Sequence, residues 1–161
     1  MEKAGKYFAG TALTQLSGEN VKYLDSNNAN AQTKKHLEAL AIYKGYILVS
    51  DSGTIGRVTY VLNMHDGHVA TNNLIRIVIE DEHLRGYVYQ FLRSDIGQSL
   101  MLKHAHGINQ GRLEPEVIAE VPIPIPKDES KVKVIGQAVL DSIERSQAAT
   151  DLGKSLLGVE N

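Results

Sequence analysis

All four prolines of this chain fall between residues 115 and 126, and this cluster limits the possible folds more than any other feature. In VPIPIP, residues 121–126, proline alternates with Val121, Ile123 and Ile125, so the three apolar side chains share one face. Proline donates no backbone hydrogen bond, which restricts such a segment to a sheet edge or an extended strap. We therefore expect the cluster to separate a compact domain, residues 1–126, from a C-terminal arm, residues 127–161.

The arm has the apolar spacing of one long helix, from about residue 128 to Leu157. Its apolar stripe comprises Val132, Ile135, Val139, Ile143, Leu152 and Leu156. A helix of this length would reach roughly 45 Å. An apolar stripe on such an arm predicts a partner helix. The alternative is that the arm folds back on its own domain.

The compact domain combines strand patterns with helical ones, which predicts a mixed α/β (α+β) fold. Strands are expected at Tyr46–Ser50, Arg57–Leu62 and Asn73–Glu80, which are rich in β-branched and aliphatic residues. A helix capped by Asp81 is expected around residues 84–92, and a second one after Asp95.

Two polar stretches of the domain are expected to be loops. Residues 26–35, SNNANAQTKK, have the composition of a long polar loop, and residues 36–43 that of a short helix or turn. Residues 103–112, KHAHGINQGR, are polar and interrupted by glycine, which again indicates a loop.

Composition removes several function classes. The chain has no cysteine, which excludes disulfides, thiol catalysis and cysteine zinc sites. No apolar run approaches the roughly 20 residues that span a bilayer, and the first ten residues lack a signal-peptide core. We expect a soluble cytoplasmic protein with no membrane contact. Net charge is −2, but residues 1–112 carry 12 Lys and Arg against 10 Asp and Glu, so the domain alone is slightly basic.

Asp51 raises an enzymatic alternative. LVSDSGT, residues 48–54, matches the active-site segment of aspartic proteases, and a chain of this size would have to dimerise to supply the second carboxylate. VIGQAVL, residues 134–140, even resembles the second segment of retroviral proteases, but here it lies in a charged helical pattern. The competing interpretation makes Asp51 a turn residue whose side chain bonds to nearby backbone N–H groups.

Other chemistries find less support. Gly53 and Gly56 do not form a phosphate-binding glycine motif. The histidine pairs 65/68 and 104/106 lack the spacing of a metal motif, so we assign no metal. Residues 103–112 suit DNA better, because Asn and Gln pair with adenine, Arg with guanine and Lys with phosphate. A solvated loop would have the same composition.

Five segments, in order, carry a further signal: YKGYILVSDSGTIGRVTYV, HVATNNLIRIVIED, HLRGYVYQFLRSDIGQSLM, HGINQGRLEPEVIAEVPIPIP and VKVIGQAVLDSIERSQAATDLGKSLL. Together they resemble the target-recognition domain and spacer helix of type I restriction–modification specificity subunits, over about residues 41–157. The correspondence includes a strand and Ser-Gly-Thr-Ile-Gly turn, a Tyr-rich helix with a Gly-Gln pair, a Gly-x-x-Gln loop, and the Ile-Pro-Ile-Pro strap. One recognition unit is present here, where full subunits carry two.

The resemblance implies a non-catalytic protein that recognises a double-stranded DNA sequence. It also implies that the helix docks DNA methyltransferase subunits, which bind S-adenosylmethionine, and through them the restriction subunit; this chain itself would bind no cofactor. A homodimer through the helix is a further expectation. The candidate DNA contacts are Lys103, His104, His106, Asn109, Gln110 and Arg112, followed by Ser52, Thr54, Arg57, Asn72 and Asn73. A helical scaffold without DNA binding remains the third alternative.

Overall fold

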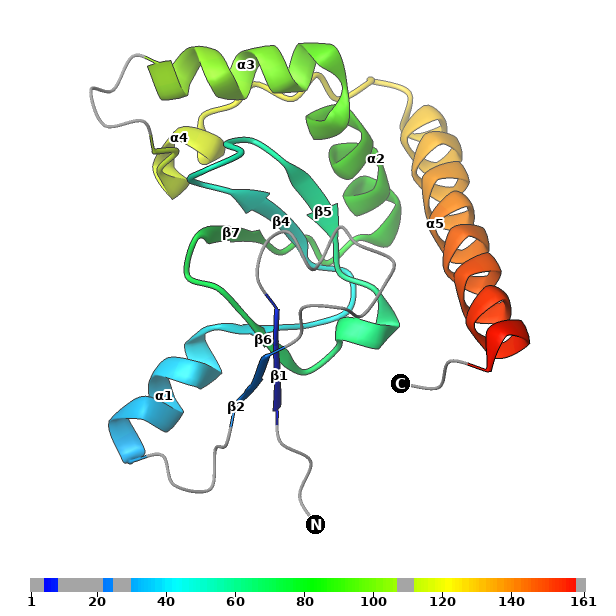
Figure 1. The fold of residues 1–161 in the computed structure, drawn as a ribbon. Coiled ribbons are helices and arrows are strands. Elements are labelled where there is room, and N and C mark those ends of the chain that lie inside the picture. The colour runs from blue at the N-terminus through cyan, green and yellow to red at the C-terminus, as the bar shows by residue number, and fades with distance from the viewer. Residues whose placement is uncertain (1–4, 9–21, 25–29, 107–111, 159–161) are drawn as a thin grey trace.

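A computed structural model describes residues 5–8, 22–24, 30–106 and 112–158, and it contains two sheets and a set of covering helices (Figure 1). The strands are β1 (Gly5–Phe8), β2 (Lys22–Leu24), β3 (Ala41–Ile42), β4 (Ile47–Ser50), β5 (Val58–Tyr60), β6 (His68–Ala70) and β7 (Leu74–Ile77). The helices are α1 (Ala31–Ala39), the 3-10 turn η1 (Asn63–His65), α2 (Glu82–Arg93), α3 (Asp95–His106), α4 (Pro115–Ala119) and α5 (Glu129–Leu157).

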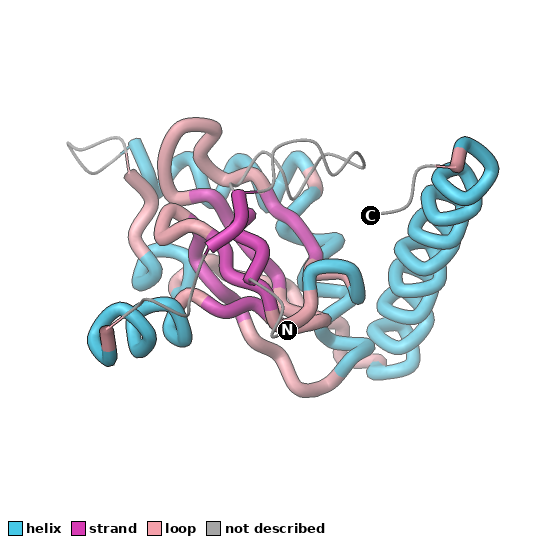
Figure 2. The backbone as a smooth tube through the Cα atoms, turned by 60° about the horizontal axis from the view of Figure 1, so that its bottom comes forward, coloured by secondary structure: helices cyan, strands magenta, loops and turns pink. Residues whose placement is uncertain are grey.

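The two sheets differ in topology. An antiparallel sheet has the order β5-β4-β7, and a mixed sheet has the order β2-β1-β6-β3, with β1 parallel to β6. The strands gather at the centre of the molecule, with helices around them (Figure 2). α2, α3 and α5 lie on one side of the antiparallel sheet, and α1 lies at the opposite end (Figure 1).

The central strand β4 is covered on both faces. Ile47, Leu48 and Val49 are fully buried, and successive side chains of a strand point to opposite faces. Ile47 and Val49 pack with the helices in the larger core cluster, whereas Leu48 packs with Ile42 and other residues of the second cluster. The continuous apolar run of the sequence is therefore the signature of a strand between two layers.

Helix α5 packs on its own domain through its first half. Gly86 of α2 and Gly136 of α5 meet where the two helices touch backbone to backbone. A Cβ on Gly86 would lie 2.5 Å from the Gly136 carbonyl oxygen, so no larger residue fits without moving a helix. This close contact explains why α5 runs alongside α2 in Figure 1.

The predicted apolar stripe of the arm is divided by this packing. Val132 is buried, and Val139 and Ile143 are half-buried against the larger core cluster. Ile135 is exposed, and Leu152 and Leu156 are 61% and 78% exposed. The alternative that the arm folds back on its domain thus describes the first half of α5, while the second half presents apolar side chains outward. The domain boundary at residue 126 stays a prediction.

Two sequence expectations need correction. Residues 31–35 belong to helix α1, which Asn30 caps by accepting a hydrogen bond from Thr33 N, rather than to a loop. α3 continues to His106, four residues into the stretch expected to be a loop. VPIPIP forms no strand, so of the two forms expected the extended strap fits; Val121 is buried and Ile123 packs on the core as the shared face predicts, whereas Ile125 is 52% exposed. The long helix is confirmed at Glu129–Leu157, capped by the Asp128 side chain.

Buried His65 makes the stability of the fold sensitive to acid. Desolvation, together with smaller contributions from the charges of His68 and Lys154, lowers the pKa of His65 from 6.5 to about 4. Between these values the unfolded chain binds a proton that the folded chain excludes, so stability falls as pH falls from about 6.5 towards 4. We expect His65 to account for a loss of about 2 kcal/mol between pH 7.5 and pH 5.

Urea unfolding of the wild type and of His65→Gln at both pH values would measure this loss. Other titrating groups contribute equally to both proteins, so the difference between them isolates His65. An identical pH dependence in the two proteins would contradict the prediction.

Candidate nucleic-acid interface

The connection between β4 and β5, hereafter the 51–57 turn, is closed by Ser50. Gly56 N donates a hydrogen bond to Ser50 O at 2.9 Å, and Arg57 N donates to Ser50 Oγ at 3.2 Å. The Ser50 hydroxyl donates in turn to Thr54 O. These bonds, one to the carbonyl of Ser50 and two through its hydroxyl, hold the turn on a single residue, so its shape is set locally.

The tip of the turn projects away from the domain. Gly53 has φ +68°, in the left-handed region that favours glycine, and a Cβ there would meet nothing within 4 Å. Gly53 and Thr54 are exposed, and Ser52 is half-buried. The polar groups of Ser52 and Thr54 therefore sit on a defined, accessible turn.

Asp51, at the start of this turn, is buried and ion-paired. Arg112 donates from Nε (3.0 Å) and Nη2 (2.7 Å) to Oδ2 of Asp51, whose side chain is 5% exposed against 49% for Arg112. The Asp51 carbonyl accepts from Leu113 N at 2.8 Å, and its N–H donates to Asn73 O at 3.1 Å. Within the described residues, Oδ1 of Asp51 has no hydrogen-bond partner.

This geometry gives the protease alternative no support. An aspartic dyad requires a second carboxylate that shares a proton with the first. The side chain of Asp51 meets the guanidinium of Arg112 instead of a second carboxylate. The turn interpretation also needs correction, because the side chain that bonds to the turn's backbone is that of Ser50.

The candidate DNA contacts of the first half of the domain converge on Asp51. Asn72 and Asn73 are exposed on the turn that leads into β7, and the Asn73 carbonyl is the acceptor for Asp51 N. Arg57 is exposed at the far end of the 51–57 turn. The 51–57 turn, the Asn72–Asn73 turn and the segment at Arg112 and Leu113 are distant in sequence but meet at buried Asp51.

The second group of candidates lies at the end of α3 and beyond it. Lys103 is exposed on α3. His104 and His106 belong to the same helix rather than to a loop, and the structure does not describe their side chains. Asn109 and Gln110 lie outside the described residues. Arg112 is placed by its ion pair, which occupies the Nε and Nη2 donors that bidentate base recognition would use.

Two residues of structural importance to this region escaped the sequence reasoning. Gln98 of α3 donates from Nε2 to Gly56 O (2.9 Å) and to Leu92 O (2.7 Å), which fastens the 51–57 turn to the helices. Arg76 donates to several backbone carbonyls beneath the Asn72–Asn73 turn. The sequence shows Gln98 in a Gly-Gln pair, but nothing in the neighbouring residues indicates which carbonyl its side chain contacts.

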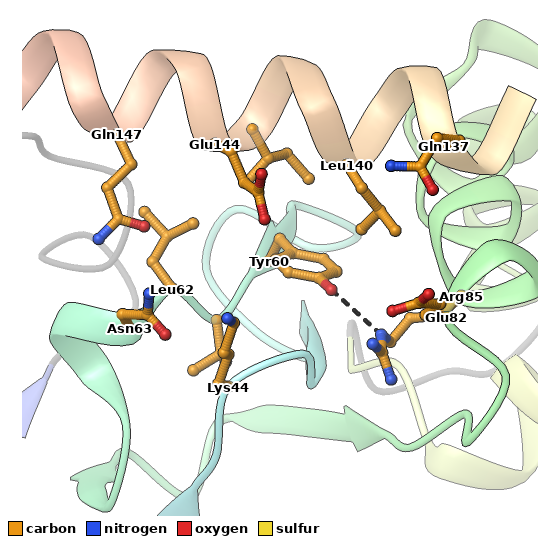
Figure 3. A pocket seen from close by; sticks show the side chains of 12 residues that line it. Lys44, Tyr60, Leu62, Asn63, Glu82, Arg85, Gln137, Leu140, Glu144 and Gln147 are labelled. Carbon is orange, nitrogen blue, oxygen red and sulfur yellow. Dashed lines mark hydrogen bonds between the residues drawn. The ribbon is translucent and has the colours of Figure 1, made fainter.

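A small polar cleft lies between α5 and the antiparallel sheet, and Figure 3 shows the side chains around it. Tyr60 accepts a hydrogen bond from Arg85 Nε at 3.1 Å on its floor, and Glu144 and Gln147 reach in from α5. Its volume of about 140 Å³ is below the roughly 300–1,000 Å³ of typical ligand pockets. The cleft is therefore too small for a nucleotide cofactor.

The residues that the structure describes offer neither a metal-binding cluster nor a membrane-spanning helix. These residues contain no group of three His, Cys, Asp or Glu side chains able to hold a metal ion. Among the same residues, every helix is too short or too polar to cross a membrane.

Comparison with known proteins agrees with this architecture. A family model described as "Type I restriction modification DNA specificity domain" matches residues 3–150. No curated protein matches the chain. A solved structure described as "Structural basis underlying complex assembly and conformational transition of the type I R-M system" contains a chain similar to this one, with a TM-score of 0.59 and 16% identity. The alignment covers 96% of this chain and 41% of that chain, so this chain spans less than half of its relative's length.

Proposed function

The chain belongs to the family of type I restriction modification DNA specificity domains, and on that premise we propose that it recognises a short sequence in double-stranded DNA without catalysing a reaction. The observation that carries the proposal is the family match over residues 3–150. The geometry supports it independently, because exposed polar residues of the 51–57 turn and of the Asn72–Asn73 turn lie beside the Asp51–Arg112 ion pair.

The proposed DNA surface consists of the 51–57 turn, the Asn72–Asn73 turn and the end of α3. Ser52, Thr54, Asn72 and Asn73 offer the hydrogen-bonding groups that read base edges, and Arg57 and Lys103 offer charge to phosphate. His104, His106, Asn109 and Gln110 remain proposed contacts on the strength of the sequence. In this proposal, loss of a base-reading Asn109 or Gln110 costs roughly 1–3 kcal/mol and relaxes one base position.

The second half of α5 is the proposed assembly surface. Leu152, Leu156 and Leu157 are 61%, 78% and 80% exposed, and a run of exposed leucines on one helix suits a protein partner. DNA methyltransferase subunits, which carry S-adenosylmethionine, are the proposed partners, with the restriction subunit joining through them. A second copy of this chain is the alternative partner for the same surface.

Selection from a pool of randomised DNA duplexes at near-physiological salt tests the recognition proposal. The chain is used alone and together with its neighbouring methyltransferase subunit, and the retained duplexes are sequenced. A recurring site of a few base pairs is the expected result. Retention without preference would leave only electrostatic binding, and no retention in either format would favour a helical scaffold without DNA binding.

Replacement of Lys103 separates phosphate contact from base reading. We expect Lys103→Ala to weaken binding to the selected duplex and to a scrambled duplex by the same factor, because phosphates carry no sequence information. The slope of log affinity against log salt should fall by about one. Exposed Lys133 on α5 supplies the matched control, since it lies outside the proposed DNA surface. A loss confined to the selected duplex would contradict the phosphate role.

A further inference from the structure

Asp51 occupies a position where one residue bonds to two other chain segments, one at Asn73 and one at Arg112 and Leu113. Its N–H donates to Asn73 O, its carbonyl accepts from Leu113 N, and its carboxylate accepts the fork of Arg112. The residue itself is 3% exposed and cannot reach a DNA duplex across the protein surface. Its contacts are all directed inward, so its effect on DNA would pass through the segments that it joins.

Gln98 forms a second set of hydrogen bonds, at the opposite end of the 51–57 turn from Asp51. Its two Nε2 hydrogen bonds use the Gly56 carbonyl of the turn and the Leu92 carbonyl near the end of α2. Gly56 is buried and lies against Gln98, Leu102 and Met101 of α3. The turn is thereby bound to the helix that carries Lys103.

We infer that Asp51 and Gln98 are positioning residues for DNA recognition, and that the Asp51–Arg112 ion pair gives Arg112 a positioning role as well. Together they fix the 51–57 turn, the Asn72–Asn73 turn and the end of α3 as one unit. Reading a base sequence requires several polar groups to be in register with base edges at the same time. This inference rests on the proposed DNA recognition and names the residues on which its specificity depends.

Sequence preference and affinity for arbitrary DNA should depend differently on the position of these turns. Contacts with phosphate tolerate displacement of a loop, because charge attraction is long-ranged and independent of sequence. Hydrogen bonds to base edges weaken steeply with distance and angle. Loosening of the turns should therefore lower the preference for the correct sequence while leaving binding to arbitrary DNA in place.

The test uses the full chain and two substitutions that keep side-chain size. Gln98→Met removes both amide donors, and Asp51→Asn removes the charge that holds Arg112. Exposed Gln90→Met on α2 is the matched control, since Gln90 is outside both the turn contacts and the DNA surface. The probes are a duplex enriched in the selection and a scrambled duplex of the same composition, at one salt concentration. Hydrogen exchange, measured without DNA, reports the Gln98 contact at Gly56 N and the Asp51 contact at Leu113 N.

We expect Gln98→Met and Asp51→Asn each to lower affinity for the enriched duplex at least tenfold and affinity for the scrambled duplex less than twofold. Exchange should rise at Gly56 N in the first variant and at Leu113 N in the second, while thermal denaturation still shows a folded protein. A purely structural role would lower both affinities together. Faster exchange with an unchanged ratio of affinities would overturn the inference and leave the proposed function intact. A wild-type chain without sequence preference would overturn both.

Discussion

Gly136→Val is expected to destabilise the protein by about 3 kcal/mol or more, through overpacking at the contact between α2 and α5. A Cβ at Gly136 would overlap the carbonyl oxygen of His83 and lie 2.6 Å from its carbonyl carbon. Both are backbone atoms of a helix, so no side-chain rotation relieves the clash. Either the helices separate and expose Val132, Val139 and Ile143, or the whole domain loses stability.

Gly153→Ala on the same helix is the matched control. A Cβ at Gly153 meets nothing within 4 Å, and alanine is the better helix former. We expect this variant to gain about 0.5–1 kcal/mol, because the unfolded chain loses conformational freedom. Urea unfolding of both variants, followed by circular dichroism, measures the two opposite shifts. Equal stability of Gly136→Val and the wild type would show that α5 does not pack closely on α2.

Arg76→Met is expected to cost about 2–4 kcal/mol, because it removes the charge-assisted hydrogen bonds that Arg76 donates to several backbone carbonyls. Arg76 lies on β7 of the antiparallel sheet, but its Nη2 donates to Leu40 O at 2.8 Å and to Ala70 O at 3.4 Å, beside the mixed sheet. Nη1 donates to Leu74 O at 2.8 Å. Burial lowers the pKa of the Arg76 guanidinium, and the stabilising charge of Tyr46 opposes this effect.

Arg76→Lys distinguishes the geometry of the guanidinium from its charge. Lysine keeps the positive charge but presents a single ammonium group in place of a planar fork. We expect lysine to restore less than half of the stability that Arg76→Met loses. Arg145→Met, at an exposed position, should change stability by less than about 0.5 kcal/mol. Thermal and urea unfolding of the three variants provide the comparison. Full stability in Arg76→Lys would mean that charge alone suffices.

The secondary structure was largely readable from local pattern. The helical spacing before Arg93 and after Asp128 predicted α2 and α5, because an amphipathic helix repeats its apolar residues every three to four positions. Each predicted strand was confirmed at its centre but proved shorter at its ends, since a strand stops where its neighbour stops pairing. The first half of helix α1 was missed because polar residues 26–35 do not show that Asn30 caps a helix, although a short helix or turn was expected from residue 36.

The candidate site was less readable. The sequence singled out Asp51 and Arg112 separately, 61 residues apart, and assigned them to different chemistries. Their ion pair exists only because the end of β4 and the segment after α3 meet in space. Gln98 stood out only as part of the Gly-Gln pair, and neither Gln98 nor Arg76 gave a local signal of its partners, since these are backbone carbonyls, which every residue possesses.

The sequence by itself determined the type of protein: the strands of the antiparallel sheet, the helices α2 and α3, the long C-terminal helix, and the family, whose five segments were recognisable in sequence. These properties follow from local periodicity and from residues close together along the chain. Only the tertiary structure decided that α5 packs on α2 through two glycines, that Arg112 neutralises Asp51, and that Gln98 binds the 51–57 turn. Such contacts join residues tens of positions apart, and no local pattern encodes the partner of a buried charge or the space beside a glycine.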